Sequence, residues 1–429
     1  MPTTSISDSG TAISPPEPDL TPGEFVARAA RLVPMLVEQQ AETEERTFYS
    51  EETHKAFLDA GLYHVNIPRR FGGYEFGAGT FAQIAATLAR GCPSAAWCFT
   101  FGTGHTAALA GYWNEQAQQD VFGDGLFICP STAKPQGSAK KVDGGWLING
   151  TFNYCSGAPY ATHFWGHTFS ETPDGSPPAG LLMFVIAADQ FERLDDWGGQ
   201  LGLRGSGSHS LKIVDGFVPD HRVMENATVV SLVPDPDGTT IGLRLHDNPV
   251  YTDASVRWFL LEPLGVAAGM IRGAQDEYAE LMSKVTPFPP PMPRKEHPDY
   301  QLWYGQGAGK VAAVEALVRD YSHEMDTAGT TGKLSPADDS RLLSVAFEGM
   351  QLGWDALQKY FFRSAGSSQV RSETRTERIW RDYSQLHTHS VNLLSAQFLR
   401  GIALTDFDVQ LPMPNPFPPP AADLAPQTT

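Results

Sequence analysis

The chain has 429 residues, of which 41% are hydrophobic, so roughly two or three packed units are expected. Its formal net charge of -18 argues against binding to nucleic acid or to anionic membrane surfaces, because both reward clustered lysine and arginine. We see no signal-peptide pattern and no long apolar run. The composition therefore predicts a soluble, cytoplasmic protein without a nucleic-acid or membrane partner.

The four cysteines lack the CxxC spacing of a metal or redox motif. They stand in apolar surroundings, so we interpret them as reduced, structural thiols and predict no metal site. These residues are Cys92, Cys98, Cys129 and Cys155.

The apolar pattern divides the chain into three parts between two polar, proline-containing tails. Helical periodicity dominates the first and third parts, whereas short β-type runs separated by Gly, Asp and Pro dominate the second. The tails lack the apolar residues that a core needs. The expected divisions are a disordered tail over 1–22, an N-terminal helical domain over 23–125, a central β-barrel or sandwich over 126–230, a C-terminal helical bundle over 231–408 and a proline-rich tail over 409–429.

Four long amphipathic patterns in the third part predict helices. They cover 255–282, 309–325, 335–362 and 373–404. Ser335 before Pro336 supports the start of the third helix, because a capping serine before a proline is a typical helix beginning. In the β-type part, residues 143–145, reading DGG, predict a tight turn between two strands.

An unusual concentration of ionisable residues lies in the last of these patterns, between Trp380 and His389. Asp382 and His389 are nearly two helical turns apart, so both are expected on one face of a helix, with Arg381 beside them. His387 is rotated from His389 by roughly 200 degrees and is expected to point elsewhere. Such groups inside a bundle favour a functional site, and an ordinary ion pair with a structural histidine is the open alternative.

Two motifs and the order of the three parts resemble the acyl-CoA dehydrogenase superfamily. Residues 68–73, reading PRRFGG, are similar to the proline and paired-glycine turn of its N-terminal helical domain. Residues 198–208, reading GGQLGLRGSGS, with VDGFVP at 214–219, are similar to its flavin-side and barrel-closing signature. The resemblance spans residues 25–405 approximately and implies an α+β fold with an N-terminal helical domain, a central β-domain and a C-terminal helical bundle.

Within the superfamily, the chain resembles the flavin-dependent monooxygenases of two-component systems more than the dehydrogenases. Most dehydrogenases carry their catalytic carboxylate in a Tyr-Glu-Gly type of turn in the C-terminal domain, and we find no such turn here. The monooxygenase residues, in their order and spacing, correspond to His105, Ser131, Ser156, Arg381, Asp382 and His389.

The resemblance implies hydroxylation of an aromatic, phenolic small molecule by a C4a-hydroperoxide, which forms from reduced flavin, FMNH2 or FADH2, and molecular oxygen. No second nucleotide site for NAD(P)H is visible, so a separate NAD(P)H-flavin reductase is expected to supply the reduced flavin. The superfamily also implies a homotetramer.

Four residues receive catalytic roles from the resemblance. Ser156 is expected near the flavin N5, where its hydroxyl steadies the hydroperoxide, and His389 is expected to donate a hydrogen bond or a proton to the peroxide. His105 is expected to bind the phenolic oxygen, which Ser131 shares. Structural alternatives stay open, namely a Ser-Gly turn for Ser156, a helix cap for His105 and a turn position for Ser131.

Further residues are expected to hold the flavin. Backbone N–H groups and side chains of the glycine-rich segment can line the ring or a phosphate, and a flexible loop is the alternative. Arg363 and Ser367 resemble the segment that reaches the flavin phosphate of an adjacent subunit. The predicted cofactor-binding residues are Ser156, Trp197, Arg204, Ser206, Ser208, Arg363, Ser367 and Asp382, the last of which orients His389 or anchors its helix.

Three rival functions remain open. The same fold could serve an acyl-CoA dehydrogenase-type oxidoreductase, or a monooxygenase that oxygenates nitrogen or sulfur. A non-catalytic flavin-binding protein is the third alternative, because a fold alone does not determine a function.

Overall fold

The computed structural model describes residues 17–172, 180–286, 290–331 and 336–409, so most of the two predicted disordered tails, and Ser335, lie outside the described residues. The first part is helical. Thr21 caps the first helix by accepting the N–H of Glu24, and Pro22 occupies its first turn. The helices are α1 (Pro22–Glu38), α2 (Gln40–Arg46), α3 (Glu51–Asp59), α4 (Ala78–Gly91), α5 (Pro93–Thr103), α6 (His105–Tyr112) and α7 (Glu115–Phe122).

One seven-stranded sheet forms the central part, in the order β5-β6-β2-β1-β3-β4-β7. The predicted turn at 143–145 joins β1 to β2, with Gly144 at a φ of 72°. Only the β1–β3 pairing is parallel among the described strands. The strands are β1 (Ser138–Val142), β2 (Gly145–Phe152), β3 (His163–Ser170), β4 (Leu181–Ala187), β5 (Glu192–Arg193), β6 (Leu211–Pro219) and β7 (Val223–Glu225).

The C-terminal part is a bundle of long helices. The prediction of a helix over 255–282 is confirmed by α9. The second predicted helix begins earlier than expected, at Pro298, where three glycines obscure the apolar pattern and Gly307 leaves room for the ring of Phe361. The helices are α8 (Ile241–His246), α9 (Ser255–Met282), α10 (Pro298–Thr331), α11 (Pro336–Ala356), which runs into a π-helix (Leu357–Phe362), α12 (Arg363–Ala365), α13 (Arg375–His387) and α14 (Ser395–Asp406).

The prediction of one helix over 373–404 is wrong. Helix α13 ends at His387, Thr388 is its C-cap, and a short 3-10 helix (Ser390–Leu394) precedes α14. His389 has an extended backbone, with φ -61° and ψ 143°, so it does not continue the helical face of Asp382. Asn392 donates its side-chain N–H to the carbonyl oxygen of Leu386, which satisfies one of the helix-end acceptors without glycine or proline.

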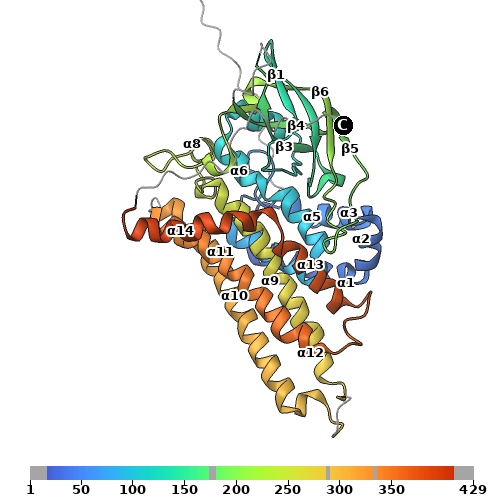
Figure 1. Ribbon diagram of the computed structural model, residues 1–429. Helices are drawn as coiled ribbons and strands as arrows, with labels where there is room; N and C mark the ends of the chain where they lie inside the picture. The colour runs from blue at the N-terminus through green and yellow to red at the C-terminus, as the bar shows by residue number, and fades with distance from the viewer. Residues whose placement is uncertain (1–16, 173–179, 287–289, 332–335, 410–429) are drawn as a thin grey trace, which may run out of the picture.

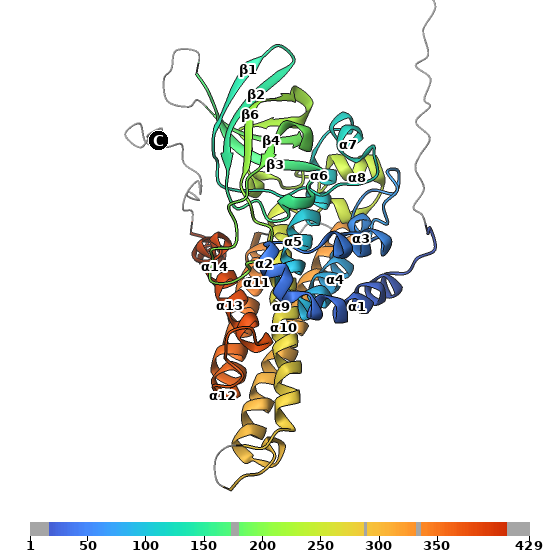
Figure 2. The same cartoon turned by 90° about the vertical axis from the view of Figure 1, so that its right-hand side faces the viewer.

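The sheet lies at one end of the molecule, and α9 and α10 extend away from it (Figure 1, Figure 2). One hydrophobic core joins the N-terminal helices to the bundle, and a second core lies inside the curled sheet, where Phe152, Phe164 and Phe184 meet. A Cβ at Gly269 would collide with the carbonyl oxygen of Ala86, so glycine allows α9 to approach α4 closely. None of the described helices has the length and apolar character to cross a membrane.

Candidate active site

Three aromatic residues of α5 and α6 define one line of side chains. Trp97, Phe101 and His105 follow one another at intervals of four residues, which places them along one side of nearly continuous helix. The rings of Trp97 and Phe101 are stacked, with centroids 4.3 Å apart. With a helical rise of 1.5 Å per residue, Trp97 and His105 are about 12 Å apart along the axis.

The structure brings Ser156 and His389 to the first of these residues. The indole N–H of Trp97 donates to the hydroxyl of Ser156 at 3.0 Å, and the ring of His389 lies edge-on to the indole at 5.2 Å. Nδ1 of His389 accepts the N–H of Val391 at 3.3 Å, so the neutral ring carries its proton on Nε2. Burial lowers the pKa of His389 to about 4, which keeps it a neutral hydrogen-bond donor at physiological pH.

A row of buried hydroxyls continues from Ser156. Its Oγ lies 2.8 Å from Oγ of Ser208, which lies 2.8 Å from Oγ of Ser206. Each hydroxyl has one proton and two lone pairs, so the row can reverse its hydrogen bonds to suit a partner. Three of the predicted cofactor-binding residues are therefore neighbours.

Helix α13 holds the loop that carries Ser206 and Ser208. Asp382 accepts the N–H of Leu203 at 2.6 Å, and Arg381 donates to the carbonyl oxygen of Leu201 at 3.0 Å while pairing with Glu44 at 3.0 Å. Burial raises the pKa of Asp382 to about 7, against the lowering effect of the Leu203 N–H. Of the two roles expected for Asp382, its contacts support anchoring.

Two aromatic side chains, those of Tyr154 and Trp197, contact each other on the segments that precede Ser156 and the glycine-rich loop. Tyr154 has a φ of 66°, a strained conformation for a large residue, and its side chain is 66% exposed. Its ring lies 5.6 Å from that of Trp197, whose indole donates to the carbonyl oxygen of Leu203. Arg204 donates to the carbonyl oxygen of Gln200, within the same loop. The sequence does not predict this conformation of Tyr154, because no neighbouring residue marks the position as one with a positive φ.

The other end of the aromatic line opens onto a second cluster. Nδ1 of His105 donates to the carbonyl oxygen of Cys129 at 2.6 Å, which leaves a lone pair on Nε2. Neither this Nε2 nor the buried hydroxyl of Ser131 has a partner in the described part of the chain. Burial lowers the pKa of His105 to about 4. The two residues expected to share a substrate oxygen are thus unpaired acceptor and hydroxyl groups in the protein interior.

Two residues of this cluster were missed by the sequence reasoning. Glu262 of α9 is fully buried, and its Oε1 lies 3.9 Å from Nε2 of His105. His167 of β3 is also fully buried, with Nδ1 donating to the carbonyl oxygen of Thr132 at 2.8 Å. A single carboxylate in the apolar run at 258–264, reading WFLLEPL, is the signal that could have identified Glu262.

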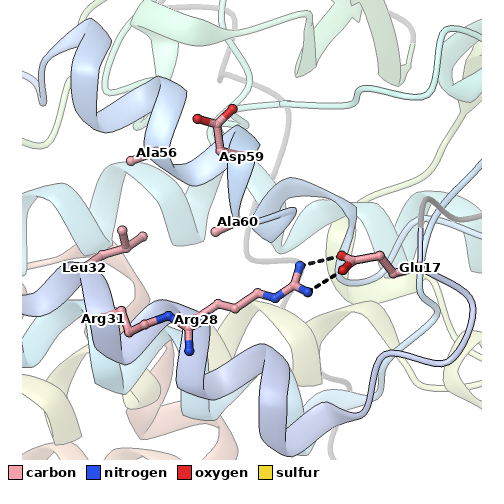
Figure 3. A pocket seen from close by; sticks show the side chains of 7 residues that line it. All are labelled: Glu17, Arg28, Arg31, Leu32, Ala56, Asp59 and Ala60. Atoms are coloured by element: carbon pink, nitrogen blue, oxygen red, sulfur yellow. Dashed lines mark hydrogen bonds and ion pairs between the residues drawn. The ribbon is translucent and has the colours of Figure 1, made fainter.

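Arg363 and Ser367 lie away from this site. Both are exposed, and α12, which begins at Arg363, lies toward the end of the bundle far from the sheet in both views (Figure 1, Figure 2). Their contact with a flavin of an adjacent subunit stays a prediction. Figure 3 shows a surface hollow between α1 and α3, where Arg28 donates two hydrogen bonds of 2.6 Å to Glu17. That hollow contains none of the predicted site residues.

Known proteins are similar to this chain in sequence and in fold. The family described as acyl-CoA dehydrogenase, N-terminal domain, matches residues 24–123. A pigment production hydroxylase of Rhodococcus sp. is 30% identical over 375 residues, which are 87% of this chain and 93% of that protein. The chain belongs to the flavin-dependent monooxygenases of the acyl-CoA dehydrogenase superfamily.

Other relatives agree with this assignment. The oxygenase subunit HsaA of Rhodococcus jostii, a flavin-dependent monooxygenase, is 27% identical over 383 residues, covering 85% of this chain and 94% of that subunit. The structure of XiaF from Streptomyces sp. in complex with FADH2 and glycerol superimposes with a TM-score of 0.83 at 22% identity, covering 91% of this chain and 97% of XiaF, and supports the fold. The two sequence relatives named above are a hydroxylase and an oxygenase subunit, which disfavours the dehydrogenase and non-catalytic alternatives.

The residues of this monooxygenase fit a flavin. The reversible hydroxyl row of Ser156, Ser206 and Ser208 can match the mixed donors and acceptors of an isoalloxazine edge. Tyr154 and Trp197 form an aromatic pair on the segments that precede these serines in the sequence. His389 contributes a donor next to Trp97. The chemistry of these residues is therefore compatible with a flavin at the Trp97 end of the aromatic line.

Proposed function

We propose that the chain is the oxygenase component of a two-component system, which uses reduced FMN or FAD and molecular oxygen to hydroxylate an aromatic compound that bears a hydroxyl group. The alignment of Trp97, Phe101 and His105 carries the proposal, because it runs from the buried hydroxyls at Ser156 to the unpartnered buried polar groups at His105. Its relatives include the oxygenase component of p-hydroxyphenylacetate 3-hydroxylase from Acinetobacter baumannii, 25% identical over 267 residues. A separate NAD(P)H-dependent reductase, a homotetrameric assembly and a cytoplasmic location belong to the same proposal.

The two histidines have opposite hydrogen-bonding roles. A bound reduced flavin supplies the electrons that activate oxygen for transfer to the substrate. His389 holds a proton on Nε2 at the flavin end, and His105 presents a lone pair on Nε2 to the hydroxyl proton of the substrate.

The function is tested by supplying the purified protein with reduced flavin from an unrelated reductase, a panel of phenols and isotopically labelled O2. We expect one labelled oxygen atom in the product, detected by mass spectrometry. Product without the label, or hydrogen peroxide as the sole product at the level of a protein-free control, would refute the proposal.

Replacement of His389 by alanine is expected to slow hydroxylation about 10²-fold and to divert reducing equivalents to hydrogen peroxide, because the donor at the flavin end is lost. The matched control is His387→Ala, since His387 is exposed and stacks on Trp354 with ring centroids 5.5 Å apart. The rate of product formation and the ratio of product to hydrogen peroxide are both measured at fixed flavin supply. Equal ratios in the two variants would remove His389 from the reaction.

A further inference from the structure

Glu262 is a buried carboxyl group for which the described residues supply no hydrogen-bonded counter-charge. Its side chain is fully buried on α9, and neither Oε1 nor Oε2 has a hydrogen-bond partner in the part of the chain that the structure describes. An ionised carboxylate without a partner is among the most costly groups to bury, so such a group takes up a proton instead. Burial accordingly raises the pKa of Glu262 well above its ordinary value.

The surrounding titratable groups do not alter this state. His105 of α6 and His167 of β3 are the histidines on this side of α9, and burial lowers the pKa of each to about 4, so both are neutral. On α9 itself, Arg257 is committed to Asp253 at 2.6 Å and to Asp339 at 2.8 Å. Glu262 therefore stands as a neutral carboxylic acid, which has one O–H donor.

The backbone makes room for this carboxyl. Gly104 separates α5 from α6, and a Cβ at this position would collide with Oε1 of Glu262. A buried polar group without a partner lowers stability, so an apolar residue would suit this position better if packing were its purpose. Protein sites that retain such groups are commonly functional.

The distance between Glu262 and His105 is suited to a shared oxygen atom. Oε1 and Nε2 are 3.9 Å apart, too far for a direct hydrogen bond. An oxygen about 2.8 Å from each would complete both, with roughly a right angle between the two bonds. His105 can only accept at Nε2, and the carboxylic acid can donate, so the oxygen between them must carry a proton and also a free lone pair.

We propose that Glu262 is a substrate-binding residue that, as a neutral acid, donates a hydrogen bond to the same substrate hydroxyl whose proton His105 accepts. The inference rests on the proposed function and gives a structural reason why its aromatic substrate must carry a free hydroxyl group. An ether oxygen lacks the proton for His105. As the hydroxyl polarises toward His105, the donor on Glu262 stabilises the negative charge left on the oxygen.

The test compares two ligands and two variants in flavin-free protein. The ligands are 2-naphthol and its methyl ether, 2-methoxynaphthalene, and binding is followed by ligand fluorescence. Glu262→Gln retains an N–H donor in the same shape, whereas Glu262→Met is apolar and of similar length. Glu280→Met, at an exposed position on the same helix, is the control. Glu262→Met should fold at least as stably as the wild type because it removes a buried acid, whereas Glu262→Gln exchanges one neutral buried polar group for another.

We expect wild type, Glu262→Gln and Glu280→Met to bind 2-naphthol with similar affinity, and Glu262→Met to bind it about tenfold or more weakly. Wild type should bind the methyl ether more weakly than 2-naphthol, because the ether has no proton to donate to His105. Equal binding of 2-naphthol by Glu262→Met, or equal losses in both Glu262 variants, overturns the inference but leaves the proposed function standing. A wild type that binds no hydroxylated aromatic and oxygenates none refutes the proposed function itself.

Discussion

Replacement of His105 by asparagine is expected to lower kcat/KM for hydroxylation about 10²-fold or more while leaving the fold intact. Asparagine places an N–H close to the position of Nδ1, so the hydrogen bond to the carbonyl oxygen of Cys129 is retained. It has no atom at the position of Nε2. The substitution therefore removes only the Nε2 acceptor, which faces Glu262.

The matched variant His105→Ala separates catalysis from packing. It removes both ring nitrogens and leaves the buried carbonyl oxygen of Cys129 without its donor, which costs about 1–3 kcal/mol of stability. Steady-state kinetics and thermal unfolding of both variants, beside the exposed control His387→Asn, give the two effects. Wild-type kcat/KM in His105→Asn would show that the histidine is structural, as its helix-start position also allows.

The fold follows from the sequence wherever local pattern and tertiary packing agree. The long apolar periodicity of 255–282 predicted α9 with its bounds, because this helix is buried along nearly its whole length and needs apolar residues throughout. The break at Thr388 was not predictable in the same way. It depends on side-chain contacts of His389 and Asn392 with nearby backbone, and neither residue is a standard helix breaker.

In the candidate site, too, local motifs predict some residues, and others depend on how distant segments pack. Ser156, Ser206 and Ser208 could be assigned from motifs, since their loops are recognisable segments that folding brings to one tryptophan. The position of Glu262 against His105 could not be assigned, because it depends on how α9 packs at Gly104, far away in the sequence. His389 was predicted from the family resemblance and from its spacing along a continuous helix; the second reason is wrong, yet His389 lies beside Trp97.

The stability that the neutral ring of His167 contributes is expected to be lost in acid. Burial holds the pKa of His167 at about 4, whereas a histidine in an unfolded chain titrates near 6.5, roughly. Between these values the unfolded chain binds a proton that the folded protein does not, so this stability is present above about pH 6.5 and lost as the pH falls toward 4. The difference corresponds to about 3 kcal/mol at most.

The variant His167→Asn makes this loss measurable, since asparagine can retain the hydrogen bond to Thr132 and does not titrate. Other buried acids and histidines are common to both proteins and cancel, so the unfolding free energy of wild type minus that of the variant should fall by about 2 kcal/mol between pH 7 and pH 5. Thr168→Val, at a buried position on the same strand, should give a difference that does not change with pH. If the difference in unfolding free energy between wild type and His167→Asn did not change with pH, an anion near His167 would have to stabilise its imidazolium in the folded protein. Glu262 is the buried carboxyl beside this cluster, so its neutral state would then be wrong as well.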